Sequence, residues 1–425
     1  MSSPVFAYPE DVHFTCSRCG DCCRGWNVAL GPGEPESLRE LDWKDRVPDL
    51  VGVAPGTKVG EKYALTRKED GSCIYLGKEN QCLIHEHFGV LRKPLLCRLF
   101  PFGFLPVGDR VAVDVSFACK AVSEDRGAPL KERVPEWVRL LQGPPAQETE
   151  HAFSQKYRIG GELLWELEHA IVRLLSDPRE TILERIRAVS EFMRLAMTAD
   201  PRTDSARRLR EVMLTGVPRQ LKETPIDVEP MDKTQRAVFF HLLFLMLNPT
   251  PPDLLGRRDA RAAQDRIKAA DAYRFRGGRP WIDNRVASAT FGEIEAIALD
   301  SLVEERGTRE VERFLQAKLV GQRFLHEGES EIPFVTAVPR LLLVYPMLLW
   351  TSKALAAEGA RRSVSLEDAR RALRLLDRSF GSVPLSALPS KQRKAWEFII
   401  TETDLPLVAS VEMTRLSRSH APRRP

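Results

Sequence analysis

The stretch Cys16-Ser17-Arg18-Cys19-Gly20-Asp21-Cys22-Cys23 decides the character of the N-terminal part of this chain. It holds four of the eight cysteines in the 425 residues, and no cysteine follows Cys119. The remaining four come at wider intervals: Cys73, Cys82, Cys97 and Cys119. Thiolates gathered at one end of a chain are typical of a metal or redox centre, because soft sulfur ligands select zinc, copper(I) and iron–sulfur clusters. The sequence therefore predicts a cysteine-ligated centre.

The ligand chemistry leaves the metal open. Four thiolates form a tetrahedral zinc site or hold one iron–sulfur cluster. Side chains of adjacent cysteines diverge, so we expect Cys22 and Cys23 to serve different ligand sets, or to be one ligand and one free thiol. Eight cysteines supply two four-thiolate centres, or one centre and spare thiols. We favour an iron–sulfur cluster of the 4Fe-4S type, with zinc as the alternative, and the candidate ligands are Cys16, Cys19, Cys22, Cys23, Cys73, Cys82, Cys97 and Cys119.

The charge distribution argues against a nucleic-acid partner. The net charge is +4, and residues 1–125 carry 15 basic and 18 acidic side chains, so the cysteine-rich part is not a basic finger. The N-terminus lacks the basic start and apolar core of a secretory signal. The longest apolar runs, such as Leu341–Trp350, fall short of the roughly 20 residues that span a bilayer. We expect a cytoplasmic protein with no membrane partner, where clustered cysteines indicate a metal more than disulfides.

The composition and periodicity along the chain predict an α+β protein. Residues 1–125 are rich in glycine and proline and read as a small, irregular metal-binding unit. Residues 126–416 read as a mostly helical domain on which this unit is docked, and residues 417–425 as a disordered basic tail. Nothing in the sequence indicates the oligomeric state.

Local patterns predict several elements. Cys73–Leu76 is a strand candidate, and a hairpin through the turn Gly77–Gln81 places Cys73 beside Cys82. Alternation predicts a strand over Arg110–Cys119. Apolar stripes at helical spacing cover 164–174 and 182–196, and 231–247 is expected to be a helix whose second half, almost apolar all round from Ala237, is buried. Asp177 is expected to cap the helix over 182–196, and Ser365 begins a capping arrangement. Leu341–Trp350 is expected to be a buried helix kinked at Pro346. Glu162, Glu166 and Glu168 are predicted to form a solvated helix face.

Arg98, which follows Cys97, is the candidate cofactor-binding residue. Its planar guanidinium donates hydrogen bonds, and hydrogen bonds to cluster sulfurs tune the potential. A surface salt bridge is the alternative role. No Ser-His-Asp order, phosphate-binding loop or His-Glu-x2-His motif occurs, so no catalytic residue is assigned.

The order of the cysteine motifs resembles the YkgJ-type cysteine-cluster family. The resemblance covers about residues 10–120 and is carried by Cys16–Gly25, Cys73-x2-Leu76, Cys82-x-Ile84, Pro94-x2-Cys97-Arg98-x-Phe100-Pro101 and the late Cys119. It implies a zinc- or iron-chelating domain. Two positions depart from the pattern: Lys93 stands where arginine is common and His85 where tyrosine is common.

A cysteine cluster followed by a long helical region is similar to the flagellin lysine N-methylase (FliB) branch. The stretch Cys22-Cys23-Arg24-Gly25-Trp26 and the segment Val311–Leu325 carry this likeness. It implies an iron–sulfur cluster, S-adenosylmethionine as methyl donor, and a protein substrate that presents exposed lysines. The alternative is a non-enzymatic module with a helical partner-binding domain, which uses its metal for structure, electron transfer or sensing.

Overall fold

The computed structural model describes residues 4–25, 28–59, 62–141, 150–201, 211, 226–248, 260–299, 305–327, 330–380, 398 and 404–418. The chain forms two compact units. The cysteine unit comprises His13–Gly103 and Val115–Pro129, and the helical unit comprises Met1–Val12, Phe104–Asp114 and Leu130–Pro425. The N-terminal strand and the middle of the 102–115 hairpin thus belong to the helical unit. Both segments lie within the range 1–125 that the sequence pattern assigns to the metal-binding unit.

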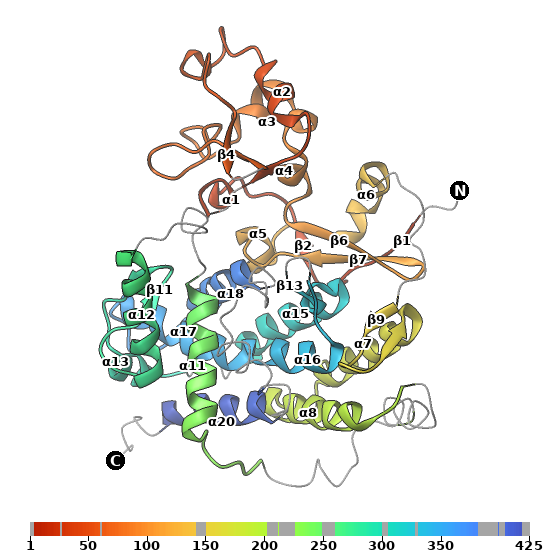
Figure 1. Ribbon diagram of the computed structural model, residues 1–425, viewed down its shortest axis with the longest axis vertical. Coiled ribbons are helices and arrows are strands. Elements are labelled where there is room, and N and C mark those ends of the chain that lie inside the picture. Colours follow the sequence, from red (N-terminus) through yellow and green to blue (C-terminus); the bar gives the residue numbers. More distant parts are fainter. Residues whose placement is uncertain are drawn as a thin grey trace. The chain divides into compact units, whose positions relative to one another are not determined.

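The cysteine unit is built from short elements joined by turns (Figure 1). Its helices are α1 (Asp21–Gly25), α2 (Glu34–Arg39), α3 (Leu83–Phe88), α4 (Leu95–Leu99) and α5 (Lys120–Ser123), with 3-10 turns at Pro48–Leu50 and Val90–Arg92. A three-stranded sheet has the order β3 (Ala29–Leu30), β5 (Lys62–Leu65), β4 (Gly56–Val59), and β2 (His13–Phe14) pairs with β8 (Ala128–Pro129). Among the residues of this unit that the structure describes, no helix exceeds six residues, so packing and not helix propensity holds the unit together.

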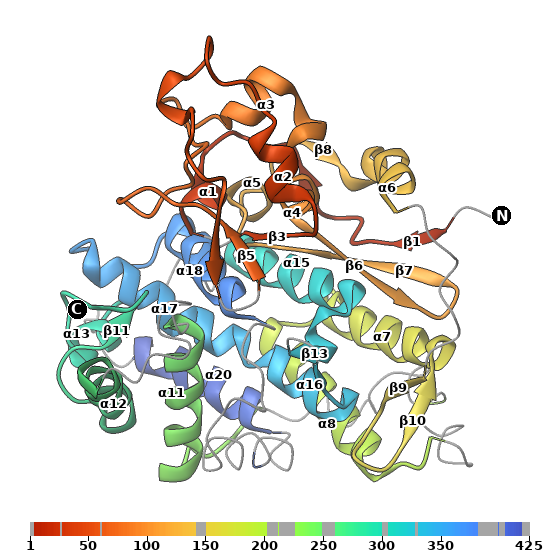
Figure 2. The same cartoon turned by 45° about the horizontal axis from the view of Figure 1, so that its top comes forward.

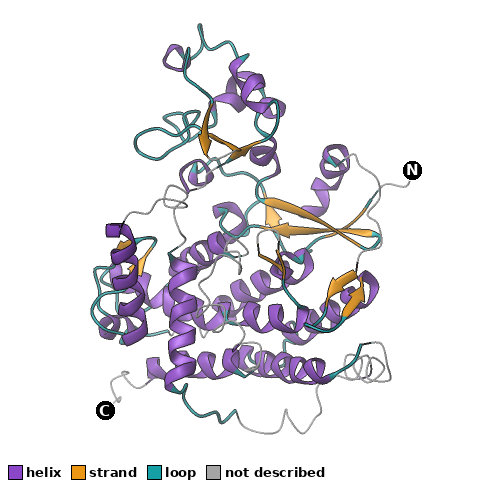
Figure 3. Ribbon diagram, in the orientation of Figure 1, coloured by secondary structure: helices purple, strands orange, loops and turns teal. Residues whose placement is uncertain are grey.

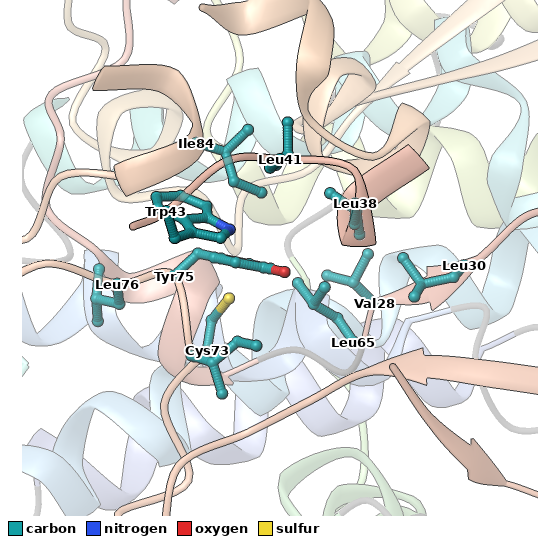
Figure 4. Packing of buried hydrophobic residues seen from close by; sticks show 11 residues of the cluster. Val28, Leu30, Leu38, Leu41, Trp43, Leu65, Cys73, Tyr75, Leu76 and Ile84 are labelled. Carbon is teal, nitrogen blue, oxygen red and sulfur yellow. The ribbon is translucent and has the colours of Figure 1, made fainter. Parts of the chain in front are cut away.

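A small apolar core fills the cysteine unit. The Trp43 and Tyr75 rings stack with centroids 5.5 Å apart, and Phe88 meets Trp43 edge-on at 4.8 Å. The same cluster contains aliphatic side chains (Figure 4), including Val28, Leu30, Leu38, Leu41, Leu65, Leu76 and Ile84. The core also contains Cys73, which is 9% exposed, so the thiols lie at the edge of an apolar layer.

Helices dominate the helical unit (Figure 3). They are α6 (Val134–Leu140), α7 (Gly161–Leu175), α8 (Ile182–Thr198), α11 (Lys233–Leu247), α12 (Ala260–Phe275), α13 (Phe291–Glu295), α15 (Glu305–Gly321), α16 (Phe334–Leu342), α17 (Val344–Glu358), α18 (Leu366–Ser379) and α20 (Leu405–Arg418), with 3-10 turns at Leu130–Arg133 and Arg323–Leu325. One three-stranded sheet has the order β1 (Val5–Ala7), β7 (Arg110–Val115), β6 (Phe102–Val107). The described part of this unit also contains three two-stranded ribbons: β9 (Glu150–Ala152) with β10 (Arg158–Gly160), β11 (Trp281–Ile282) with β12 (Arg285–Val286), and β13 (His326–Glu327) with β14 (Ser330–Glu331). These small sheets beside long helices confirm the predicted α+β class.

The central element of the helical unit is α17, which contacts α13, α16, α18 and α20 (Figure 2). Among the described residues, Phe334–Glu358 is the one stretch long and apolar enough to cross a bilayer, and its most apolar window is wholly buried, as in the core helix of a soluble domain. The helix breaks at Leu343, three residues before the kink predicted at Pro346. The break precedes the proline because the ring displaces the carbonyl four residues earlier and removes one donor.

Helix caps confirm one prediction and correct another. Ser365 caps α18 in a capping box with Asp368, as predicted. The cap of α8 is Thr181, paired with Glu184, and not Asp177, which lies in the preceding turn. In both helices the cap is a pair of reciprocal side chain–backbone hydrogen bonds at the first turn. The sequence Thr181-x2-Glu184 is itself a capping-box signature. The predicted tail 417–425 overlaps the end of α20 at residues 417–418, and residues 419–425 lie outside the described part.

The predicted solvated face of α7 is wrong at one position. Glu162 is exposed and Glu166 half-buried, but Glu168 is 1% exposed. Gln322 donates a 2.8 Å hydrogen bond to one Glu168 oxygen, and the other has no hydrogen-bond partner. Burial raises the pKa of Glu168 to about 8. The carboxyl is therefore protonated and neutral in the folded chain at neutral pH, which makes its burial tolerable.

Candidate metal centre

A tight turn before α1 sets the first cysteines in place. Gly20 has φ +75°, a left-handed conformation that favours glycine, and a Cβ here would lie 3.2 Å from Asn80 Cβ. The Cys23 amide donates to the Gly20 carbonyl at 3.0 Å, which starts the helical turn. Cys22 and Cys23 then follow one another on α1, with their sulfur atoms 3.9 Å apart.

The segment 73–82 brings two more cysteines to the same place. The Cys73 amide donates to the Cys23 carbonyl at 2.8 Å, and Cys73 also forms an isolated bridge with Arg67. Leu76 bridges Cys82 across the turn Gly77–Gln81, so the predicted reversal is present. The predicted strand at Cys73–Leu76 is wrong, because the Leu76 amide bonds back to the Cys73 carbonyl at 3.0 Å and closes a turn. The reversal is set by local turn residues, whereas strand formation needs a continuous partner that this segment lacks.

The last two cysteines sit at short helices. Cys97 lies within α4, which follows Pro94. Cys119 is the N-cap of α5, and the strand predicted over Arg110–Cys119 ends at Val115. The Cys119 amide donates to the Ser116 carbonyl at 3.2 Å, so residues 116–119 turn instead of continuing the strand.

Five of the eight cysteines line one cavity of about 50 Å³. They are Cys22, Cys23, Cys73, Cys82 and Cys97. The rest of the wall is mostly apolar and comprises Val28, Leu65, Tyr75, Ile84, Pro94 and Phe100, with the basic residues Arg67 and Lys93. One water molecule needs roughly 10–15 Å³ of such space, so the cavity exceeds the room for a single small guest.

Three thiols of the cavity have a raised pKa, which favours their neutral form. Burial raises the pKa of Cys73 to about 11 and that of Cys97 to about 12. The pKa of Cys22 is raised further, first by its hydrogen bond with Cys23 and then by burial. A bound metal ion reverses this situation, because its charge stabilises the thiolates and releases their protons.

Lys93 and Arg67, two basic residues that the sequence did not predict to be site residues, line the same cavity as these thiols. The positive charge of Lys93 acts to lower the pKa of both Cys22 and Cys97. Arg67 lines the cavity and also donates to the Arg24 carbonyl at 3.1 Å. Arg98, predicted to bind the cofactor, is absent from the cavity wall, and its buried Nε has no hydrogen-bond partner. In the sequence, the one feature that distinguishes this position is that Lys93-Pro94 stands where Arg-Pro is common in the YkgJ-type pattern.

The other three cysteines lie outside the cavity wall. Cys16 is exposed, whereas Cys19 and Cys119 are half-buried. Burial raises the pKa of Cys119 to about 12, and the thiols of Cys19 and Cys22 add to that rise. The Cys119 thiol therefore lies within electrostatic reach of Cys19 and Cys22. In the described part of the chain, no three His, Cys, Asp or Glu side chains already stand in metal-binding geometry.

The donor set fits a thiophilic metal. Free thiols from three separated segments converge on one cavity, and its two basic residues offset the negative charge of a thiolate-ligated centre. Such a centre would be held by cysteines of the cavity wall. Zinc would supply a structural crosslink there, whereas iron–sulfur would supply electron transfer or a substrate-binding metal.

Comparison with known proteins agrees with this site. Residues 15–120 match the model of the CxxCxxCC family, described as "Putative zinc- or iron-chelating domain". An uncharacterized protein of Methanocaldococcus jannaschii, MJ0939, is 31% identical over 96 residues, which are 22% of this chain and 30% of that protein. The chain thus spans less than a third of this curated relative. No solved structure matches the chain. Residues 15–120, whose cysteines all lie in the cysteine unit, are thus similar to the domain that this family model describes.

Proposed function

We propose that the cysteine unit binds an iron–sulfur cluster of the 4Fe-4S type in its thiol-lined cavity. One observation carries the proposal: cysteines from α1, from the 73–82 segment and from α4 line a single cavity. A cluster of this type needs four thiolates, and five are available there.

The space and the wall favour a cluster over one zinc ion. A tetrahedral zinc ion sits about 2.3 Å from each sulfur and leaves no further void, whereas the cavity here measures about 50 Å³. The apolar wall excludes water, which protects a cluster and tunes its potential. Eight free thiols also support a reducing compartment, and we assign the protein to the cytoplasm on that basis.

The test is an anaerobic purification of the full chain with iron, acid-labile sulfide and zinc determined per chain. We expect a brown protein with equal iron and sulfide, and its loss in Cys97→Ser. Cys16→Ser is the matched control, because Cys16 is exposed and outside the cavity wall, and it should retain iron and sulfide. A colourless protein with zinc in the cavity and no sulfide would contradict the proposal.

We extend the proposal to methyl transfer from S-adenosylmethionine to lysines of a partner protein. Its support is the likeness of Cys22-Cys23-Arg24-Gly25-Trp26 and the long helical region to flagellin lysine N-methylases. Calorimetry with S-adenosylmethionine and mass spectrometry of a lysine-rich protein incubated with the cluster-loaded chain test this extension. Binding and mass gains of single methyl groups support it. An intact cluster with neither result favours the non-enzymatic metal module.

A further inference from the structure

We infer that a groove in the helical unit, lined by three arginines, binds a small phosphate ester. The groove has a volume of about 420 Å³ and is formed by the β11–β12 hairpin, the C-terminal end of α17 and the second turn of α18. Its arginines are Arg285, Arg361 and Arg371. All of these segments belong to the helical unit, so the site is independent of the cluster proposed for the cysteine unit.

The fold gathers the three guanidinium groups from separate elements. Arg285 lies in β12, Arg361 follows the end of α17, and Arg371 lies in α18. The helices α17 and α18 pack side by side (Figure 2). No local spacing in the sequence predicts this arrangement, because the arginines meet only when the hairpin and the two helices have packed.

The position of Arg361 is fixed by the end of α17. Its guanidinium donates to the Asp368 carboxylate and, at 3.4 Å, to the Leu355 carbonyl. Gly359 has an ordinary φ of −83°, so its backbone does not require glycine. A Cβ at Gly359 would however lie 2.6 Å from Arg361 Nη1. The glycine therefore provides the space in which the guanidinium lies.

The position of Arg285 is fixed by the hairpin turn that precedes it. Asp283 and Asn284 have φ values of +53° and +60°, as in the two-residue turn that suits the twist of a β-hairpin. The Asn248 side chain holds this turn, since its oxygen accepts from the Asn284 amide at 2.9 Å and its nitrogen donates to the Trp281 carbonyl at 2.8 Å. The strand that carries Arg285 is thus anchored to the end of α11.

The groove keeps an excess of positive charge. In the part of the chain that the structure describes, Arg285 and Arg371 have no ion-pair partner, and Arg361 pairs with Asp368. Glu358 is the acidic residue of the wall. Guanidinium groups present planar forks of donors that match the oxygen atoms of phosphate, and each such bond is assisted by charge. An anion with several oxygen atoms would therefore relieve the repulsion between these arginines.

The rest of the wall indicates an organic ligand and not a bare ion. The volume falls within the roughly 300–1,000 Å³ of small-molecule sites. Leu355 and Val286, which is 54% exposed, supply apolar surface, and Ser288 supplies a hydroxyl. The Glu358 carboxylate repels phosphate but accepts hydrogen bonds from hydroxyl or amino groups. The ligand class is therefore a phosphate ester whose organic part carries such groups, as nucleotides and sugar phosphates do.

Calorimetric titration of the full chain tests the site. The probes are adenosine 5′-monophosphate and ribose 5-phosphate, with adenosine, ribose and inorganic phosphate for comparison. At least one ester should bind more tightly than inorganic phosphate, and its phosphate-free counterpart should not bind. Arg285→Gln and Arg371→Gln should each weaken binding roughly tenfold or more, because each removes a charge-assisted hydrogen bond. Arg274→Gln is the matched control, since Arg274 is an exposed arginine of α12 outside the groove wall, and it should bind as the wild type does.

Three results would overturn the inference. They are the absence of binding by both esters, equal affinities of Arg371→Gln and Arg274→Gln for the ester that binds, and tighter binding of citrate or heparin than of either ester, which would indicate a general anion surface. Both arginines to be replaced are exposed, so the variants should fold, and circular dichroism checks this. If Arg285→Gln does not fold, Arg371→Gln decides. Any of the three results leaves the proposed cluster standing, because iron and sulfide are measured separately.

Discussion

Lys93 shows how one side chain adjusts the chemistry of the thiol cavity. It lines the cavity, and its charge favours the ionised form of the Cys22 and Cys97 thiols. A nearby cation also stabilises the reduced form of a cluster, because reduction adds negative charge. Arg67 is the other basic residue in the wall, so the two share this role.

Replacement of Lys93 by methionine is therefore expected to lower the reduction potential of the cluster. The loss of about 1 kcal/mol of charge interaction corresponds to roughly 40 mV for a one-electron couple. A spectroscopically monitored redox titration measures the shift. Lys78→Met, at an exposed position in the Gly77–Gln81 turn, is the control. Equal potentials for both variants and the wild type would contradict the assigned role of Lys93.

Glu168 links the stability of the helical unit to pH. Its pKa is about 8 when folded, against an ordinary value of 4.5, so the folded state binds the proton more tightly than the unfolded state. Stability from this group is complete below pH 4.5 and is lost as the pH rises through 8, with a limiting slope of about 1.4 kcal/mol per pH unit.

Glu168→Gln keeps an acceptor for Gln322 and cannot ionise. We expect the variant to match the wild type near pH 4.5 and to become progressively more stable than it towards pH 8. Urea unfolding followed by circular dichroism at a series of pH values measures the difference. Glu162→Gln, at an exposed position of the same helix, should not produce it. A pH-independent difference for Glu168→Gln would rule out the buried neutral carboxyl.

At the scale of an element, α18 depends on its first turn. The Ser365 side chain accepts from the Asp368 amide at 3.3 Å, and the Asp368 carboxylate accepts from the Ser365 amide at 2.9 Å. Ser365→Ala is expected to destabilise the helical unit by about 1 kcal/mol, because one amide of the first turn loses its acceptor.

The urea midpoint and hydrogen exchange in the first turn of α18 measure this effect. The control is Ser363→Ala, an exposed serine two residues before the cap, which should stay within about 0.5 kcal/mol of the wild type. Equal effects of the two alanines would mean that the cap contributes nothing specific to α18.

At the scale of the whole molecule, a buried ion set joins three distant segments of the helical unit. Lys318 of α15 lies 3.1 Å from Asp114 of β7 and 2.8 Å from Asp377 of α18. The backbone approaches closely there, since a Cβ on Gly321 would lie 2.5 Å from Asp114 Cα. Burial acts to raise the pKa of Asp114, and Lys318 opposes that rise.

Lys318→Met is expected to destabilise the helical unit by about 3–5 kcal/mol, because it removes the buried cation that contacts both the Asp114 and the Asp377 carboxylates. The triple variant Lys318→Met, Asp114→Asn, Asp377→Asn should recover most of the loss, since it removes all three charges. Urea unfolding measures both. The exposed Lys268→Met should change the free energy of unfolding by less than about 0.5 kcal/mol. A single variant as stable as Lys268→Met would show that the ion set is dispensable.

The sequence by itself determined the features that depend on neighbours along the chain. These are the gathering of thiols, the apolar stripes of α7 and α8, the apolar helix α11, the cap at Ser365 and the reversal at Gly77–Gln81, because periodicity, capping and turn chemistry act within a few residues. Only the tertiary structure decided which thiols share a cavity, that Lys93 and Arg67 line it, and that Glu168 is buried and neutral. Those properties come from packing and desolvation by residues far away in the chain, which no local pattern records.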